Sequence, residues 1–312
     1  MSVVIPTYNR RDWLPRVLTP LLDDPATTEL VVVVDGSSDG SIEMLREWAS
    51  REPRLRPLHQ ENAGQGAARQ AGVEAAVGEV VVLLDDDIVA GPGLVGAHAA
   101  WHRGDVHRVV LGYTPNQAPP RRAGHAPTIL YSQDYEKVHD GFERDPRTVF
   151  TDFWSGNFSI RRADVLRVGM QVEGNIGYHE DQQFGFRCRH AGLEPVFDRR
   201  IAALHLHERT LADLADECRR QGAARVELAL QYPDVAGPAD ATTALPRPVR
   251  LAVRSTRRSP VLAAAASRAL WALGEGAGRL RVSPVEVAAA RLLRQVELDR
   301  GAQEALRERR PG

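Results

Sequence analysis

Residues 80–87 read Val80-Val81-Val82-Leu83-Leu84-Asp85-Asp86-Asp87: five apolar residues followed directly by three carboxylates. An apolar run this short fits a strand, and because it has no polar position it predicts a strand that is buried on both faces. Residues 3–6 and 30–34 are two earlier runs of the same kind. Strands of this type are typical of a parallel sheet that is covered by helices on both sides.

Helical patterns separate these strands along the chain. Residues 11–22 carry Pro15, which is tolerated in a first helical turn. Ser41 can cap a second helix, and residues 66–76 predict a third, after a weaker strand at 54–59. The alternation predicts a three-layer α/β/α, Rossmann-like fold with a mostly parallel central sheet.

The pattern is less regular after residue 107. Residues 108–113 predict a strand, but most of 112–150 is rich in Pro, Arg, His and Gly and is interpreted as loop. Further strands are expected at 151–160, 195–199 and 201–206, and helices at 164–168, 180–190 and 211–232. Beyond a Pro/Gly-marked linker come helices rich in Ala, Arg and Leu. We therefore expect one domain at 1–232, and a linker with a C-terminal helical extension at 233–312.

The composition limits the classes of partner. Forty Lys and Arg against 41 Asp and Glu give a net charge of −1, which leaves no general basic field for a nucleic acid. The two cysteines, Cys188 and Cys218, exclude a disulfide framework and fit a reducing cytosol. The apolar stretch before Pro6 is too short for a signal-peptide core. The longest apolar stretch outside the strands, 261–273, is broken by Ser267 and Arg268 and is too short for a membrane span, so a cytoplasmic location is expected.

Polar clusters follow three of the predicted strands where they end, at residues 6–9, 35–37 and 85–87. Ligands of open parallel sheets bind at the carboxyl ends of the strands, so these clusters are expected to converge on one site. Three adjacent carboxylates repel one another unless a cation or hydrogen-bond donors compensate. Oxygen ligands of this kind suit Mg²⁺ or Mn²⁺. A solvated acidic turn is the alternative, and the position directly after a buried strand favours the metal.

Residues 62–69 read Asn-Ala-Gly-Gln-Gly-Ala-Ala-Arg. Small residues let the backbone N–H groups at a helix start approach a phosphate, and Arg69 can add further donors. Close packing of a helix on the sheet would explain the same small residues. Together with the acidic cluster, the loop favours a diphosphate held between the two.

Two further clusters are open to two interpretations each. Glu180 and Asp181 begin a predicted helix, where acidic residues complement the helix dipole, but a carboxylate there could also take a proton from a hydroxyl. His205 and His207 lie on the same face of a predicted strand. Either histidine could be a metal ligand or a hydrogen-bonded structural residue.

In their order along the chain these motifs resemble those of family 2 glycosyltransferases, which have the GT-A fold. The resemblance covers about residues 2–232, and its segments are 3–10, 34–41, 62–72, 84–87, 156–162 and 180–187. It implies a glycosyltransferase of the hexosyltransferase type that moves a sugar from a nucleoside diphosphate donor, expected to be a UDP-sugar, to an acceptor hydroxyl.

The resemblance also implies roles for single residues. Nucleotide and donor binding falls to Pro6, Thr7, Asn9, Asp35, Gly64, Arg69, Asp85, Asp86, Trp154 and Gly156. Asp87 is the implied ligand of a divalent metal, Mg²⁺ or Mn²⁺, and Asp85, His205 and His207 are further candidate ligands. Asp181 is the implied general base, with Glu180 beside it, and the product is inverted at the anomeric carbon. A retaining reaction with a histidine on the metal stays an alternative.

Three other function classes fit the residues less well. A dinucleotide-dependent oxidoreductase needs a Gly-rich turn where this chain has residues 6–9. Residues 84–89 mimic the nucleophile strand of haloacid dehalogenase phosphatases, but Lys137 is the only lysine that could offset a phosphate. A non-catalytic sugar-nucleotide adaptor is the third class, and the retained acidic residues count against it.

The C-terminal extension combines basic and apolar residues. Arg250, Arg254, Arg257 and Arg258 precede the apolar residues 261–265. Such helices fit peripheral binding at the inner face of an anionic membrane, and equally a homodimer contact or a cap on the first domain.

Overall fold

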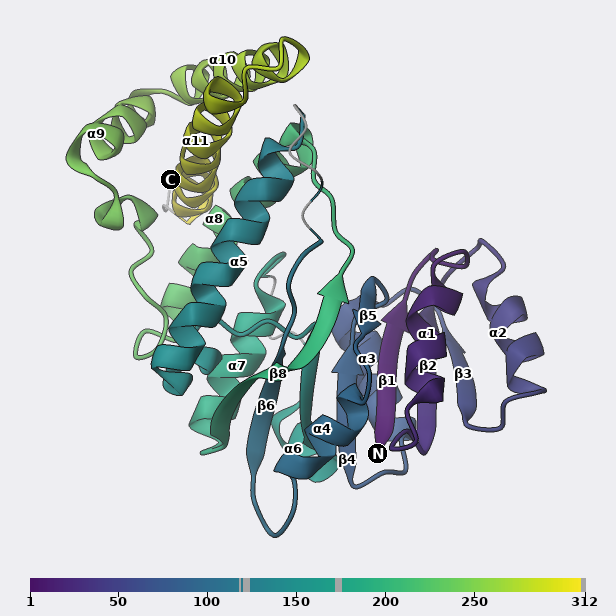
Figure 1. Ribbon diagram of the computed structural model, residues 1–312. Coiled ribbons are helices and arrows are strands. Elements are labelled where there is room, and N and C mark those ends of the chain that lie inside the picture. Colours follow the sequence, from purple (N-terminus) through teal and green to yellow (C-terminus); the bar gives the residue numbers. More distant parts are fainter. Residues whose placement is uncertain (118, 120–123, 172–175, 310–312) are drawn as a thin grey trace. The chain divides into compact units, whose positions relative to one another are not determined.

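The computed structural model describes residues 1–117, 119, 124–171 and 176–309 (Figure 1). The chain forms two compact units. The sheet unit consists of Met1–Gln117, Glu136–Glu173 and Asp181–Leu206. The helical unit consists of Ala118–Tyr135, Gly174–Glu180 and His207–Gly312.

The sheet unit is built on eight strands among the described residues, in the order β3-β2-β1-β4-β7-β6-β8-β5. The strands are β1 (Ser2–Thr7), β2 (Glu29–Asp35), β3 (Leu55–Gln60), β4 (Val80–Leu84), β5 (Ile88–Ala90), β6 (Arg108–Tyr113), β7 (Asn157–Arg161) and β8 (Glu194–His205). Strands β3, β2, β1 and β4 are parallel, and β6 is parallel to β8. Strand β7 is antiparallel to both β4 and β6, and β5 is antiparallel to β8.

The order of the strands reverses beside β1. The chain runs from β1 outward to β2 and β3, and then returns to place β4 on the other side of β1 (Figure 1). A reversal of this kind opens a crevice at the carboxyl ends of the strands on either side of it. The ends of β1 and β4, at Thr7 and Leu84, therefore flank the natural place for a ligand.

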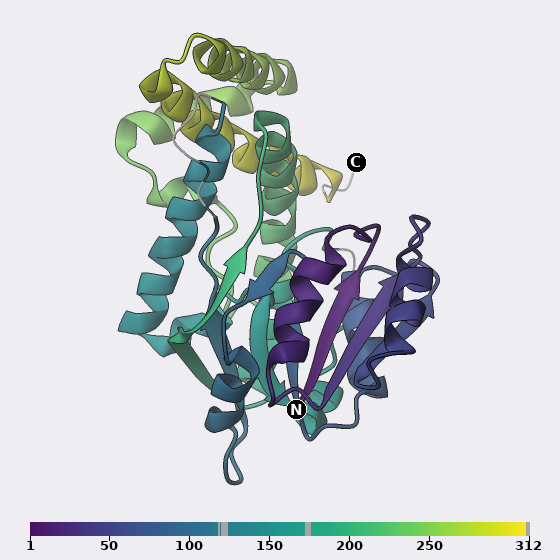
Figure 2. The same cartoon turned by 45° about the vertical axis from the view of Figure 1, so that its right-hand side comes forward.

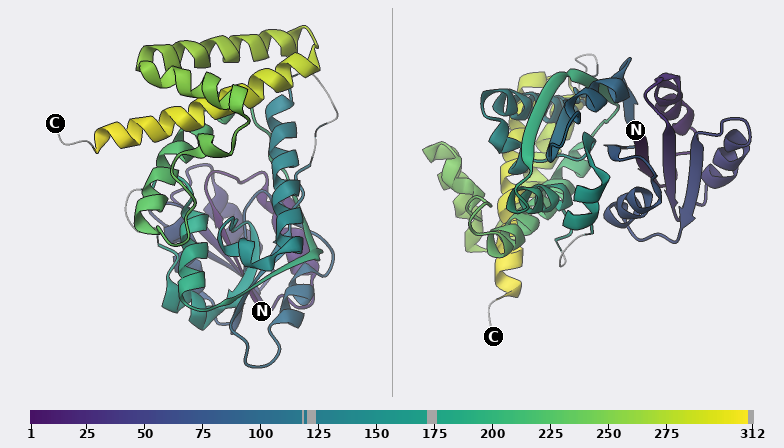
Figure 3. Two further views of the ribbon diagram at one scale, coloured as in Figure 1. Left: turned by 90° about the vertical axis from the view of Figure 1, so that its left-hand side faces the viewer. Right: turned by 90° about the horizontal axis from the view of Figure 1, so that it is seen from below.

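Helices cover both faces of this sheet, which gives the three layers. They are α1 (Leu14–Asp23), α2 (Ser41–Ala49), α3 (Gln65–Ala75), α4 (Leu94–Trp101) and α6 (Arg162–Val168), with α5 (Ala126–Arg144) and α7 (Glu180–His190) running from one unit into the other. Alternate residues of one strand belong to different cores: Ile5 packs with α1, whereas Val4 packs with α3. Figure 2 and the right panel of Figure 3 show α1 and α3 on opposite sides of β1 and β2. The predicted fold class is confirmed.

The interpretation of 112–150 as mostly loop is wrong. Helix α5 covers much of that stretch, and a 3₁₀ helix, Pro146–Phe150, follows it. The helix buries Leu130, Tyr131 and Phe142. Residues 118 and 120–123 of the same stretch lie outside the described part of the chain.

Two strand predictions also need correction. The predicted strand at 151–160 is a strand only over β7, and residues 151–156 form turns and irregular structure before it. The two short strands predicted at 195–199 and 201–206 are one strand, β8. Its pairing with β6 shifts register between Gly112, opposite Asp198, and Tyr113, opposite Ala202. This irregularity lies where the sequence pattern predicted a break between two strands.

The helical unit is formed mainly by α8 (Leu211–Gln231), α9 (Arg247–Ser255), α10 (Pro260–Arg279) and α11 (Ser283–Glu308) (Figure 3, left). Helix α11 packs against both α8 and α10. Its contact with α8 is close, because a Cβ atom at Gly222 would overlap the carbonyl oxygen of Leu298, and one at Gly301 that of Arg219. The predicted division between residues 232 and 233 falls inside this unit, since α8 packs with the helices that follow it. Among the described residues, no helix has both the length and the apolar character to cross a membrane.

Candidate active site

The ends of the first two strands and of β4 lie together. The Thr7 hydroxyl, at the end of β1, donates a hydrogen bond to Asp86 Oδ2 over 2.7 Å. The Asn9 backbone N–H donates to Ser37 Oγ at 2.9 Å, and Asn9 Oδ1 accepts from the Ser38 N–H at the same distance. Asn9 holds a left-handed conformation, with φ of 52°, which asparagine adopts more readily than most residues. The predicted clusters thus form one polar surface at the reversal of strand order.

Asp35 holds the loop that precedes α3. Its carboxylate accepts hydrogen bonds from the N–H groups of Ala63 (2.8 Å) and Gly64 (2.9 Å) and from Gln60 Nε2 (2.8 Å). Gly36 follows with φ of 74°, and a Cβ atom there would come within 2.7 Å of the Asn62 nitrogen. The loop amides that were expected near a phosphate are therefore partly engaged by Asp35.

Arg69 joins two acidic residues that are far apart in the sequence. Its side chain is only 3% exposed. Nη2 donates to Asp85 Oδ1 at 2.5 Å, and Nη1 donates to Asp181 Oδ1 at 3.1 Å. Gln65 Nε2 adds a third donor, 3.0 Å from Asp85 Oδ1. The candidate base Asp181 and Asp85 of the acidic triplet are thus bound to the same guanidinium group.

Burial and mutual repulsion act on the acidic triplet. Burial raises the pKa of the Asp85 carboxyl, the charges of Asp87 and Asp181 raise it further, and Arg69 opposes both. Burial also raises the pKa of Asp86 to about 6, against the hydrogen bond from Thr7. Carboxyls of this kind bind a proton readily, and they favour a nearby cation in its place.

Arg10 supplies part of that positive charge and was given no role by sequence reasoning. Its Nε lies 3.9 Å from Asp86 Oδ1, and its Nη2 lies 4.0 Å from Asp87 Oδ2. The side chain is 40% exposed, so the pairing is loose and screened by solvent. The sequence feature that could have indicated this role is its position directly after Asn9, in the polar cluster that follows β1.

Ser155 is the second residue that sequence reasoning missed. Its hydroxyl donates to Asp181 Oδ1 at 2.5 Å, and its backbone N–H donates to Asp181 Oδ2 at 3.1 Å. With Arg69, these donors fix the plane of the carboxylate. Glu180, the first residue of α7, is adjacent to Asp181 along the chain.

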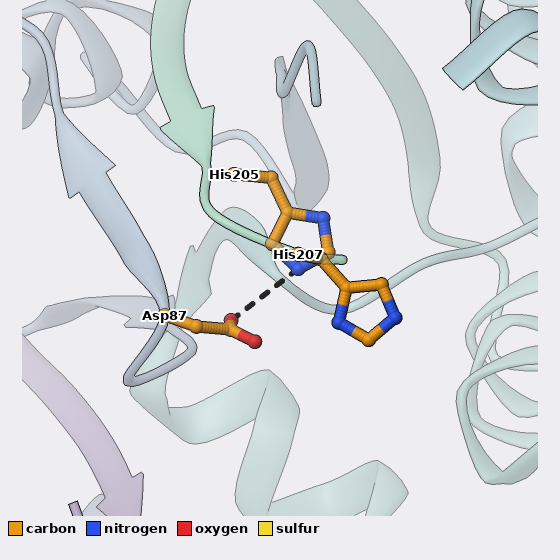
Figure 4. Close-up of side chains that lie close together, drawn as sticks. All are labelled: Asp87, His205 and His207. Carbon is orange, nitrogen blue, oxygen red and sulfur yellow. Dashed lines mark ion pairs between the residues drawn. The ribbon is translucent and has the colours of Figure 1, made fainter. Parts of the chain in front are cut away.

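Asp87 lies beside the end of β8. The Leu206 N–H donates to the Asp87 carbonyl at 3.0 Å, and His205 Nε2 lies 3.4 Å from Asp87 Oδ1 (Figure 4). His207 follows two residues later, at the start of the helical unit, and the candidate ligand atoms of Asp87, His205 and His207 lie within 4.8 Å of one another. Asp85, the other predicted ligand, is outside this group, and its Oδ1 accepts from Arg69 and Gln65. The group offers a carboxylate oxygen and imidazole nitrogens, which fits a divalent cation.

Trp154 and Gly156 complete this surface at the start of β7. The centroid of the Trp154 ring lies 5.4 Å from that of His205. A Cβ atom at Gly156 would overlap the Trp154 indole and lie 2.8 Å from Ile88 Cδ1. Only glycine lets the indole lie across the backbone at this position.

A buried hydrogen-bonded chain supports β7 and β8 and had no signal in the sequence. His98 bonds to Asn157 Oδ1 (3.0 Å) and to Ser159 Oγ (2.9 Å), and Ser159 Oγ also bonds to His102 (2.8 Å). Asn157 Nδ2 donates to the Ile201 carbonyl at 3.2 Å. Burial lowers the pKa of both His98 and His102 to about 4. Both rings are therefore neutral at pH 7. The chain links α4 to β7, which begins directly after Gly156, and to β8, which ends at His205.

Comparison with known proteins decides the family. The family described as Glycosyl transferase family 2 matches residues 2–168 of this chain. The chain belongs to this family. The resemblance inferred from the motifs is thereby confirmed, and the family is not that of the haloacid dehalogenase phosphatases.

Relatives of moderate identity are named as glycosyltransferases. Validoxylamine A glucosyltransferase from Streptomyces hygroscopicus subsp. limoneus is 31% identical over 252 residues, which cover 70% of this chain and 55% of that protein. The uncharacterized glycosyltransferase YfnE of Bacillus subtilis is 24% identical over 266 residues, which cover 70% and 67%. The chain thus spans little more than half the length of the first relative.

Solved glycosyltransferases share the fold. A mannosyltransferase from Pyrobaculum calidifontis, in complex with GDP-Man and Mn²⁺, superimposes with a TM-score of 0.63 at 18% identity, over 99% of this chain and 87% of that one. S. aureus TarS 1-349 in complex with UDP-GlcNAc gives 0.52 at 18% identity, over 98% and 91%. At this level of identity the likeness establishes the GT-A fold.

Proposed function

We propose that this protein transfers a sugar from a nucleoside diphosphate donor to an acceptor hydroxyl, with the help of a divalent cation and with inversion at the anomeric carbon. The observation that carries the proposal is the position of Arg69, which binds Asp85 of the acidic triplet with one nitrogen and Asp181 with another. A donor held at the triplet would have Asp181 within reach of its sugar.

The crevice between β1 and β4 is the proposed donor site. Pro6, Thr7 and Asn9 would line the nucleoside, and Asp35 would accept from the base. The fold is compatible with more than one base, since its solved neighbours include complexes with GDP-Man and with UDP-GlcNAc. UDP-sugars are the first donors to test, and the glucosyltransferase relative makes glucose the first sugar.

Asp87 and His205 would hold the cation, with His207 as a third ligand. The mixture of carboxylate and imidazole favours Mn²⁺ over Mg²⁺, because Mg²⁺ prefers an all-oxygen shell. When bound, the cation offsets the negative charge that builds up on the departing diphosphate. The buried Arg69 would add a fixed positive charge on the protein side.

Asp181 is the proposed general base. The two donors of Ser155 and one of Arg69 hold its carboxylate in one orientation. From there it would take the proton of the acceptor hydroxyl as that oxygen attacks the anomeric carbon, on the face opposite the departing diphosphate. Attack from that face inverts the configuration. Glu180 would bind a donor or acceptor hydroxyl, and Trp154 with Gly156 would form the floor under the sugar.

The test uses the Asp181→Asn variant of the full chain in a screen of UDP- and GDP-sugars with Mn²⁺ or Mg²⁺. We expect sugar release or transfer to fall about 10²–10⁴-fold, which is the usual contribution of a general base, because the amide cannot take the proton. Calorimetric binding of UDP with Mn²⁺ should stay close to wild type. Asp105→Asn is the matched control, since its carboxylate is 95% exposed.

Undiminished turnover by Asp181→Asn would remove this residue from the role. Wild-type protein that binds a nucleotide-sugar but never consumes it, with any of the donors, would contradict the enzymatic proposal and support an adaptor instead.

A further inference from the structure

One segment of the helical unit carries a charge unlike that of the rest of the chain. Residues 246–282 contain eight arginines and one acidic residue, Glu275, a net charge of +7. The remaining residues hold 32 Lys and Arg and 40 Asp and Glu, a net charge of −8. The excess of positive charge is therefore local to α9, α10 and their flanks.

Part of this positive charge is paired with carboxylates inside the helical unit. Arg254 and Arg257 both pair with Asp240 at 2.8 Å, and Arg257 also binds Asp299 at 2.5 Å. Five other arginines are exposed, and their side chains make no hydrogen bond or ion pair within the part of the chain that the structure describes: Arg247, Arg258, Arg268, Arg279 and Arg281.

The solvent-exposed side of α10 is apolar rather than polar. We call it the α10 face; its exposed members are Val261, Leu262, Ala265, Arg268, Ala269, Ala272, Leu273 and Arg279, together with Leu280 directly after the helix. Leu262 and Leu273 are each 51% exposed, and Leu280 is 78% exposed. Trp271, at the edge of this face, is 41% exposed. A surface helix of a globular unit normally turns polar residues outward, so this face is suited to an apolar environment.

The opposite side of α10 is occupied. Ala263, Ser267, Gly274 and Ala277 are buried, and Ser267 donates a hydrogen bond to Glu297 of α11. The left panel of Figure 3 shows α10 running alongside α11 within the unit. Contact with α11 thus fixes the orientation of α10 and leaves Leu262 and Leu273 exposed to solvent.

We propose that the α10 face, with the arginines around it, binds the surface of an anionic lipid bilayer, where α10 lies in the plane of the headgroups. An apolar stripe bordered by arginines, with a tryptophan at its edge, is the pattern of a helix that inserts shallowly at such an interface. The leucines enter the boundary of the acyl chains while Arg268 and Arg279 meet lipid phosphates.

Charge distinguishes this occupant from a second copy of the chain. In a symmetric dimer the same patch meets itself. Two such segments would bring their unpaired arginines against one another, which opposes their association. Anionic headgroups supply the complementary charge and the apolar layer together.

The test is co-sedimentation of the full chain with vesicles of phosphatidylcholine alone, or of phosphatidylcholine mixed with phosphatidylglycerol. We expect binding to the anionic vesicles, weaker binding as salt is raised, and little binding to neutral vesicles. Replacing Arg247, Arg258, Arg268 and Arg279 together by Gln should lower the partition coefficient at least about tenfold. The control replaces four exposed arginines of the sheet unit, Arg46, Arg51, Arg144 and Arg189, by Gln and should bind as wild type.

A second variant separates insertion from charge alone. Leu262→Ser with Leu273→Ser keeps every arginine, and it should still lose most of the binding. The tryptophan emission of the wild type should shift to the blue with anionic vesicles, and Trp271→Phe should remove that shift. Thermal unfolding checks that each variant is folded.

Four results would overturn the proposal: no sedimentation with anionic vesicles, equal sedimentation with neutral ones, an equal loss in the sheet-unit control, or a dimer in analytical ultracentrifugation that the leucine variant dissociates. None of these measurements depends on sugar transfer, so they stand apart from the proposed activity.

Discussion

Arg69 is the residue on which the arrangement of the acidic groups depends. Its side chain is almost fully buried, and it faces two carboxylates that would otherwise repel each other at the base of the crevice. A lysine would not replace it, because a single ammonium group cannot offer two divergent nitrogens in one plane. The positions of Asp85 and Asp181 are therefore coupled through one side chain.

We expect Arg69→Met to lower the free energy of unfolding by about 3–5 kcal/mol, because it leaves two partly buried carboxylates without their cation. Urea denaturation measures this. Arg51→Met is the control: its pair with Glu47 is 72% and 75% exposed, and its loss should cost about 1 kcal/mol or less. Equal effects of the two substitutions would mean that the Arg69 pairs contribute no more than a surface pair.

At this scale the sequence predicted some of the site and missed the rest. Arg69 and the acidic triplet could be named because each follows a recognisable loop or strand. Ser155 could not, since a serine that orients a carboxylate 26 positions away has no local pattern. Arg10 lay inside a recognised motif, but its approach to Asp86 depends on how β1 and β4 are paired.

Among the elements, the buried strands were predicted well and the irregular middle was not. β4 could be placed because Val80–Leu84 is apolar at every position, which leaves no alternative to burial. Helix α5 was missed because its apolar residues are spaced among His, Asp and Gly. Some of its buried positions are polar or aromatic, such as Thr128 and His139, so the usual contrast between its faces is weak.

The buried chain of α4, β7 and β8 gives these elements a pH dependence. The pKa values of His98 and His102 are lowered from 6.5 to about 4 by burial. Between these pH values the two histidines bind protons in the unfolded chain but not in the folded chain. Their contribution to the free energy of unfolding is therefore fully present above pH 6.5 and is lost as the pH falls toward 4. Asp86, whose pKa is raised to about 6, acts in the opposite direction below that pH.

We expect the free energy of unfolding of the wild type to fall between pH 6.5 and 4.5, and His98→Gln to reduce that fall by about 2 kcal/mol. Urea titrations at several pH values measure the difference, and taking it against wild type cancels the contribution of Asp86. His59→Gln, at an exposed position of β3, should keep the wild-type slope. An unchanged slope in His98→Gln would show that this ring is not held neutral by the fold.

For the whole molecule, the alternation of strands and helices in the sequence was the most informative pattern for predicting the fold. It predicted the parallel half of the sheet, and with it the edge at which three polar clusters meet. The alternation could not predict that α8 packs against α11. That contact depends on Gly222 and Gly301, two glycines that are far apart in the sequence and lie in segments with the pattern of ordinary surface helices.

A ligand that binds the folded protein alone stabilises the whole cooperative unit to which its site belongs, so the proposed cation site can be tested by thermal unfolding. With UDP and Mn²⁺ at about 100 times their dissociation constant, the gain is about 2.7 kcal/mol. For a unit of this size that corresponds to a rise in the unfolding midpoint of roughly 5–10 °C. Asp87→Asn should abolish the part of the rise that requires Mn²⁺, because its Oδ1, beside His205, is the proposed ligand. Asp105→Asn should retain the full rise. If Asp87→Asn still responds to Mn²⁺ as the wild type does, the cation binds elsewhere, and Asp87 and His205 are not its ligands.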